Sequence, residues 1–157
     1  MPLHTIGYEG QTLEGFLRRL KQAGVLTVVD VRELPLSRKR GFSKRALDVA
    51  LSEHGIAYAH MPALGCPKPV RDRLKADGDW PRYVRDFGAY LATQGASIGE
   101  LAKLARATPC GLLCFEADFN RCHRSLVARA AADAGGPRVV HITSETTIPD
   151  VARRSAA

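Results

Sequence analysis

The feature that most constrains the fold is a set of short apolar runs that alternate with segments of helical periodicity. The run from Val25 to Val31 is almost continuously apolar, which is typical of a parallel strand covered on both faces. The run from Gly111 to Phe115 likewise predicts a buried strand. We expect strands at five places, namely 3–6, 25–31, 56–61, 111–115 and 139–142.

Segments with apolar residues at helical spacing lie between these runs. Thr12 can cap a first helix that Gly24 ends, and Ser43 can cap a second helix that Gly55 ends. Further helices are expected near 71–76, 83–91, 98–105 and 122–134, the first of them inside a proline-rich excursion from 62 to 81. The alternation predicts an α/β fold, with a single-domain, open, mainly parallel five-stranded sheet and helices on both faces.

The α/β domain is expected to span residues 1–142, with residues 143–157 as a C-terminal tail. A chain of 157 residues can bury roughly two thirds of the surface that its unfolded form exposes. No apolar run approaches the roughly 20 residues that a membrane-spanning helix needs, so no membrane contact is expected. The N-terminus lacks a charged-then-apolar leader, and we expect a cytoplasmic protein with four free thiols.

The charge balance favours an anionic partner. The chain has 23 Lys and Arg against 16 Asp and Glu, which leaves a net charge of +7. Such an excess is typical of proteins with phosphorylated, carboxylated or nucleic-acid partners. Since many of these charges follow the second expected strand, we expect a small phosphate-bearing or nucleotide-like ligand. The alternative is a nucleic-acid-binding module, without catalysis, that uses the same basic loop with Tyr8 and Phe42.

Parallel topology also predicts where a ligand binds. In open parallel sheets, ligands bind beyond the carboxyl ends of the strands, where the loops gather. Asp30 and Arg32, the loop after Met61, and the loop from Glu116 to Arg124 each follow an expected strand. We therefore expect these segments at one edge of the sheet.

The loop after the second strand has the composition of a phosphate-binding loop. Arg32 and Arg38 could bind an anion in bidentate fashion. Ser37, Ser43 and the free N–H groups at a helix start could bind the remaining oxygens, although no glycine-rich phosphate-binding motif is present. The alternative is a solvated basic loop in which Ser43 only caps the helix.

The segment between the 111–115 strand and the last helix is the second candidate site. Cys122 lies where the helix begins, and a helix start stabilises a thiolate, so Cys122 is a candidate nucleophile beside His123 and Arg124. In a second interpretation, Cys114 is the nucleophile and Arg124 binds the substrate anion, as in the rhodaneses and cysteine phosphatases. Nine residues separate Cys114 from Arg124, too many for the tight loop of those enzymes.

Two further interpretations of this segment stay open. Cys114, Cys122 and His123 could bind zinc, since thiolate and imidazole are its usual ligands, although a paired C-x-x-C motif is missing. Alternatively, the cysteines are packing residues and Glu116 forms an ion pair with Arg124. Glu116 could instead be a general base if burial raises its pKa. The sequence thus leaves open whether the protein is an enzyme and predicts no obligatory cofactor.

Three other residues each have two candidate roles. Tyr8 could stack on a base or cover the sheet edge, and Glu9 could be a general base or an ion-pair partner. His60 precedes the proline-rich excursion and could face the ligand, although a hydrogen-bonded core histidine is commoner. Cys66, followed by Pro67, is expected to be exposed.

An ordered set of motifs resembles one known family, the bacterial and archaeal domain of unknown function 488. The resemblance runs from Thr5 to about Ile142, nearly the whole chain. The motifs are Thr5–Gly10, Asp30–Arg32, Ser37–Arg38, Gly41–Lys44, Gly55–His60, Leu64–Gly65, Leu113–Glu116 and Cys122–Arg124. The resemblance implies a compact α/β domain whose motif residues meet at one pocket, and it brings no established activity.

The resemblance nominates a set of site residues by position. They are Tyr8, Glu9, Arg32, Ser37, Arg38, Ser43, His60, Cys114, Glu116, Cys122, His123 and Arg124. Where family members often have a second glycine after the Leu-Gly pair, this chain has Cys66. The central prediction is that Arg32 and Arg124 converge on one hollow beside the sulfur of Cys122.

Overall fold

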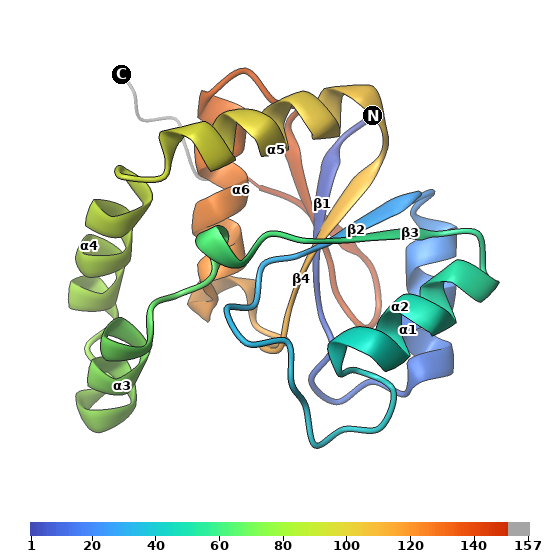
Figure 1. The fold of residues 1–157 in the computed structure, drawn as a ribbon, viewed down its shortest axis with the longest axis horizontal. Coiled ribbons are helices and arrows are strands. Elements are labelled where there is room, and N and C mark those ends of the chain that lie inside the picture. Colours follow the sequence, from blue (N-terminus) through green and yellow to red (C-terminus); the bar gives the residue numbers. More distant parts are fainter. Residues whose placement is uncertain (151–157) are drawn as a thin grey trace.

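A six-stranded mixed sheet lies at the centre of the fold, in the order β3-β2-β4-β1-β5-β6 (Figure 1). The computed structural model describes residues 1–150. The strands are β1 (Leu3–Gly7), β2 (Thr27–Asp30), β3 (Ala57–His60), β4 (Cys110–Cys114), β5 (Val139–Ile142) and β6 (Thr147–Pro149). Strands β1 to β5 pair in parallel, and β6 pairs antiparallel with β5.

The register brings three strand ends to one edge of the sheet. Gly7 at the end of β1 lies opposite Cys114 at the end of β4. Asp30 at the end of β2 lies opposite Leu113, one residue before the end of β4. The segments that follow β1, β2 and β4 therefore leave the sheet side by side.

Helices cover both faces of the sheet, as predicted (Figure 1). The α-helices of the described chain are α1 (Leu13–Gln22), α2 (Lys44–Glu53), α3 (Lys68–Asp77), α4 (Trp80–Leu91), α5 (Gly95–Ala107) and α6 (His123–Asp133). Short 3₁₀ helices occur at η1 (Pro62–Leu64) and η2 (Phe119–Arg121). One apolar core joins α1 and α2 to the sheet, and another joins α4, α5 and α6 to its opposite face. Between residues 1 and 150, no helix has the length and apolarity needed to cross a bilayer.

The prediction of five strands followed by a tail is wrong, because residues 143–150 return to the sheet and form β6. The turn that starts this return is closed by Thr143, whose Oγ1 donates to the carbonyl oxygen of Thr146 at 2.9 Å. Asp150 then accepts hydrogen bonds from Arg129 of α6 at 2.8 and 3.0 Å. Three exposed residues give too short a pattern to reveal a strand. The rest of the predicted tail, 151–157, lies outside the described residues.

The proline-rich excursion from 62 to 81 is largely helical. The helix expected at 71–76 extends over Lys68–Asp77 as α3, and Gly78 ends it with a left-handed φ of 68°. Helix α3 packs beside α4. The predicted cap of α1 is confirmed, since Thr12 accepts a hydrogen bond from the N–H of Gly15 at 3.0 Å.

Candidate functional site

A cavity of about 690 Å³ opens at the carboxyl edge of the sheet. Its volume is typical of a small-molecule pocket. Eight of the residues singled out from the sequence line it: Tyr8, Arg32, Ser37, Arg38, Cys114, Glu116, Cys122 and His123. These residues come from the segments after β1, β2 and β4 and from the start of α6, and the fold thus brings them to one place.

Ser43 and His60, by contrast, do not line the cavity, and both contact main-chain atoms of the loop after β2. The Oγ of Ser43 accepts from the N–H of Ser37 at 3.0 Å and donates to the carbonyl of Ser37 at 3.2 Å. Ser43 directly precedes α2, at the position where the sequence allowed it to cap this helix, but its side chain forms no cap bond. Nε2 of His60 lies 2.8 Å from the carbonyl oxygen of Arg32. Both side chains are thus bound to main-chain atoms of the basic loop.

Glu9 is also a backbone anchor outside the cavity. Its Oε1 accepts a hydrogen bond from the N–H of Ala117 at 3.0 Å. The N–H of Glu9 in turn donates to the carbonyl of Phe115 at 2.8 Å. These contacts tie the segment after β1 to the segment after β4.

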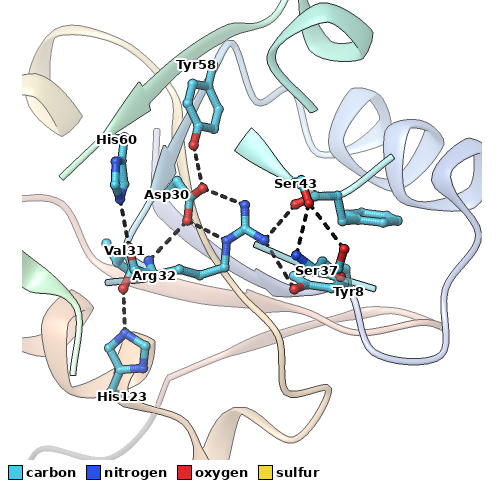
Figure 2. A network of polar contacts seen from close by, with 10 residues as sticks. Tyr8, Asp30, Val31, Arg32, Ser37, Ser43, Tyr58, His60 and His123 are labelled. Atoms are coloured by element: carbon cyan, nitrogen blue, oxygen red, sulfur yellow. Dashed lines mark hydrogen bonds and ion pairs between the residues drawn. The ribbon is translucent and has the colours of Figure 1, made fainter. Parts of the chain in front are cut away.

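Arg32 is the centre of a buried polar network at the end of β2 (Figure 2). Its Nε and Nη2 donate to the two oxygens of Asp30 at 2.9 and 2.7 Å. Its Nη1 donates to the carbonyl of Phe42 at 2.7 Å and to the hydroxyl of Tyr8 at 3.2 Å. The hydroxyl of Tyr58 donates to Asp30 as well, at 2.5 Å.

This network leaves Arg32 little capacity to bind an external anion. Burial opposes the charged form of Arg32, but the hydrogen bonds and the negative charge of Asp30 outweigh burial and raise the pKa of Arg32 further. Four of the five guanidinium N–H groups are used inside the protein. Arg32 therefore forms a rigid, positively charged part of the cavity wall.

Arg124 is buried and does not line the cavity. Its side chain is completely buried, and Nη1 donates to the main-chain carbonyl of Glu116 at 2.6 Å. The alternative ion pair with the Glu116 carboxylate does not form in the described structure. Nε and Nη2 have no hydrogen-bond partner among residues 1–150. Arg32 and Arg124 thus lie at the same end of the sheet, but of the two only Arg32 lines the cavity.

Gly7 makes this arrangement possible. A Cβ at position 7 would overlap the carbonyl group of Glu116 and would lie 3.1 Å from Nη1 of Arg124. The absence of a side chain lets the chain after β4 cross directly over the end of β1. The Glu116 carbonyl then reaches the Arg124 guanidinium.

Cys114, Cys122 and His123 form the floor of the cavity, together with Glu116. Cys114 ends β4, Cys122 precedes α6, and His123 is the first residue of α6. Their ligand atoms all lie within 4.8 Å of one another, and all three residues are buried. The Sγ of Cys114 lies 3.5 Å from Nδ1 of His123 and donates to Oε1 of Glu116 at 3.3 Å.

A backbone contact fixes the tautomer of His123. Its Nε2 lies 2.7 Å from the carbonyl oxygen of Val31. Since a carbonyl oxygen only accepts, Nε2 carries a proton, and when the ring is neutral Nδ1 has a free lone pair on the side of Cys114. The ring of Phe87 packs edge-on against the imidazole, with centroids 5.4 Å apart, and holds its orientation.

The two thiols at the floor differ in acidity. Burial alone would raise the pKa of Cys122, but contacts with Cys114 and His123 and the positive charges of His123 and Arg124 hold this pKa well below the usual thiol value. The contact with the sulfur of Cys122 and then burial raise the pKa of Cys114 well above it. The pair therefore holds its negative charge on Cys122.

The negative charge on Cys122 affects the pKa values of Glu116 and His123. Burial raises the pKa of Glu116, and the adjacent charge of Cys122 raises it further. Burial lowers the pKa of His123, but its contacts with Cys122 outweigh burial, so the net shift is upward. The floor is thus an electrostatically coupled group of two sulfurs, one imidazole and one carboxylate.

Several lining residues were not singled out from the sequence as site residues. Those after η1 are Cys66, Arg71, Leu74 and Lys75, and the others are Glu33, Leu34, Leu36, Tyr83, Phe115 and Arg121. The expectation that Cys66 is exposed is wrong: it is 2% exposed, and burial raises its pKa to about 11. A Cβ at Gly65 would overlap the main chain of Glu33, so this segment packs directly on the loop after β2. Gly65 is the sequence signal that could have revealed this close approach.

The fold and the site together define an α/β protein with a cavity at the carboxyl edge of a mainly parallel sheet. A family model described as Domain of unknown function DUF488 matches residues 12–131. The chain therefore belongs to this family, and the resemblance read from its motifs is confirmed. Neither the curated proteins nor the solved structures contain a match to the chain.

Proposed function

We propose that the cavity binds a small phosphate-bearing or nucleotide-like anion. The charge of the cavity carries the proposal, because five lining side chains are arginine or lysine and two are glutamate. Two of the five cations are paired with carboxylates. The other three form no ion pair among residues 1–150, and they are Arg38, Lys75 and Arg121.

The three unpaired cations come from different elements and surround the same space. Arg38 belongs to the loop after β2, Lys75 to α3, and Arg121 to η2. The guanidinium of Arg121 lies over the ring of Trp80, 5.6 Å from its centroid, which holds Arg121 in place without neutralising it. A phosphate group has enough acceptor oxygens to bind more than one of these side chains.

Part of the cavity wall is apolar and exposed. Leu34, Leu36 and Phe115 line the cavity and are 60%, 73% and 43% exposed, respectively. Exposed apolar side chains beside cations suit a ligand that has an organic part as well as a phosphate group. This favours a nucleotide-like anion over inorganic phosphate.

A ligand in this cavity would meet the candidate reactive side chains at its floor, which are Cys114, Glu116 and Cys122. Both cysteines line the cavity and both are free thiols. We place the protein in a reducing compartment such as the cytoplasm, because the cluster needs its thiols unoxidised.

Isothermal titration calorimetry with adenosine 5′-monophosphate tests the proposal. We expect saturable binding that Arg38→Ala or Lys75→Ala weakens by roughly tenfold, because each substitution removes a charge-assisted hydrogen bond. Arg18→Ala in α1 and Lys103→Ala in α5 remove exposed cations away from the cavity and should leave binding unchanged. Adenosine, which lacks the phosphate, should bind more weakly. Failure of the nucleotide to bind, or equal binding by all four variants, would contradict the proposal.

The nucleic-acid hypothesis depends on two aromatic rings that are buried and packed against each other. Tyr8 and Phe42 are 2% and 0% exposed, and they stack on each other with centroids 4.5 Å apart. Neither ring offers a free face to a base. Tight binding of single-stranded RNA, lost steeply between low and moderate salt, would nevertheless favour a nucleic-acid module over a small-anion pocket.

A further inference from the structure

Three atoms that commonly bind metals lie close together at the cavity floor. They are Sγ of Cys114, Sγ of Cys122 and Nδ1 of His123, all within 4.8 Å of one another. In a tetrahedral zinc site, neighbouring sulfur and nitrogen ligands lie about 3.6 Å apart, and two sulfurs slightly further. Cys114 and His123 are 3.5 Å apart and thus already have this spacing. The 4.8 Å limit of the group exceeds a ligand spacing by only about 1 Å.

The neighbours of His123 fix the orientation of its ring in the way that is typical of a metal-binding histidine. Metal-binding histidines usually donate their other ring N–H to a carbonyl or carboxylate, which fixes the tautomer. Here Nε2 donates to the carbonyl of Val31 at 2.7 Å, so the lone pair of Nδ1 is directed to the cysteines. The packing of Phe87 against the ring limits its rotation. The imidazole is therefore oriented before any metal binds.

The buried charge of Arg124 favours an anionic ligand set beside it. Arg124 is completely buried, and two of its guanidinium nitrogens have no partner in the described structure. Its positive charge acts on both Cys114 and Cys122. Two thiolates, the Glu116 carboxylate, this guanidinium and one divalent cation together have no net charge. A metal-loaded floor is thus electrostatically balanced without a charge from solvent.

We propose that Cys114, Cys122 and His123 bind one zinc ion whose fourth position is open to the cavity. Binding forms two Zn–S bonds and one Zn–N bond, and any proton on the sulfurs is released to solvent. Three protein ligands with one open position are typical of catalytic zinc sites. Glu116, whose Oε1 is 3.3 Å from Sγ of Cys114, is placed to accept a hydrogen bond from water at that position.

The proposal changes the role of the cysteines in this cavity. Cys122 becomes a metal ligand, and a bound water replaces its thiolate as the candidate nucleophile. The metal site and the anion site share the cavity but use different residues, since Arg38, Lys75 and Arg121 are not ligands. Zinc binding therefore does not depend on the proposed anion binding.

Metal reconstitution tests the proposal. Protein stripped with a chelator and reloaded with Zn²⁺ should retain one zinc per chain after gel filtration, measured by elemental mass spectrometry. Reloading with Co²⁺ should produce thiolate-to-cobalt charge-transfer absorption and the strong ligand-field bands of a tetrahedral site. Cys122→Ser and His123→Ala should weaken zinc binding by at least tenfold. Cys66→Ser, in the wall of the same cavity, and Cys110→Ser, in β4, are the matched controls and should bind zinc like the wild type.

Clear outcomes would overturn the proposal. These are substoichiometric zinc after reloading, a cobalt spectrum without the charge-transfer band, or equal zinc loss in Cys66→Ser and Cys122→Ser. Circular dichroism checks that each variant folds. If Cys122→Ser does not fold, the cobalt spectrum of the wild-type protein alone decides whether thiolates bind the metal. Nucleotide titration of the metal-free protein separates the two proposals, because retained nucleotide binding with no zinc binding contradicts only the metal site.

Discussion

Nδ1 of His123 lies 3.5 Å from Sγ of Cys114, although the two residues belong to different elements of the fold. Cys114 ends β4 and His123 begins α6, so the segment between them folds over the carboxyl edge of the sheet and closes the cavity floor. The contact depends on Gly7, because only a residue without a Cβ lets this segment cross the end of β1.

Gly7→Ala should therefore disturb the site strongly, although it adds only one methyl group. The added Cβ would overlap the Glu116 carbonyl, and we expect a loss of about 1–3 kcal/mol in the free energy of unfolding, as for overpacked cores. Urea denaturation measures this change. Gly99→Ala in α5 is the matched control: no heavy atom lies within 4 Å of the added Cβ, and a helical alanine should stabilise the protein by about 0.5–1 kcal/mol. Equal effects of the two variants would contradict the account of Gly7.

Asp30→Asn should be strongly destabilising. Asp30 is completely buried and is the ion-pair partner of Arg32, so the substitution leaves a buried guanidinium without its countercharge. Breaking such a pair costs about 3–5 kcal/mol. Asp72→Asn breaks the exposed pair with Lys68 and should change the unfolding midpoint little. If both variants unfold at the same urea concentration as the wild type, the Arg32 network does not stabilise the loop.

Stability should fall on acidification, through His141 and Asp150. Burial lowers the pKa of His141 and outweighs the opposing effect of Asp150, while the charges of Arg124 and Arg129 lower it further. A histidine whose folded pKa is lowered stabilises the fold above its unfolded value of about 6.5, and this contribution is lost as the pH falls below that value. The pKa of Asp150 is also lowered, first by its hydrogen bond from Arg129, so a further loss follows at more acidic pH.

Thermal unfolding between pH 7.5 and about 5 measures this effect, because the histidine contribution changes around pH 6.5. His141→Gln should show a flatter pH dependence than the wild type. His54→Gln alters an exposed histidine at the end of α2 and should keep the wild-type slope. A wild-type slope in His141→Gln would show that another group is responsible.

Zinc should protect the two floor thiols from alkylation. We expect iodoacetamide to modify Cys114 and Cys122 several-fold more slowly in the zinc-loaded protein than in the metal-free protein, because a metal-bound sulfur is a weaker nucleophile. Cys66 and Cys110, analysed as peptides from the same samples, should react at unchanged rates. A uniform slowing of all four would indicate general stabilisation by the metal rather than ligation.

Much of the fold was predictable because its buried parallel strands are marked by apolar runs. The run from Val25 to Val31 contains β2, and the helices between such runs force parallel pairing. Strand β6 was not predictable in the same way. It has only three exposed residues, one of them Pro149, and its attachment depends on Asp150 reaching Arg129 and His141.

The position of the candidate site was easier to predict than the set of residues that line it. Parallel strands end on the same side, so the edge that carries the cavity follows from topology. The direction in which each side chain points does not follow from topology. Ser43 and His60 bind main-chain atoms, whereas Cys66 and Lys75 enter from a proline-rich segment whose path depends on the packing of α3.

A crystal structure of the protein with adenosine 5′-monophosphate and Zn²⁺ tests the central claim most directly, which is that one cavity at the carboxyl edge of the sheet holds the ligand. We predict phosphate density beside Arg38 and Lys75 and an anomalous zinc peak between Cys114 and Cys122. A nucleotide bound on another surface, with this cavity empty, would contradict the account.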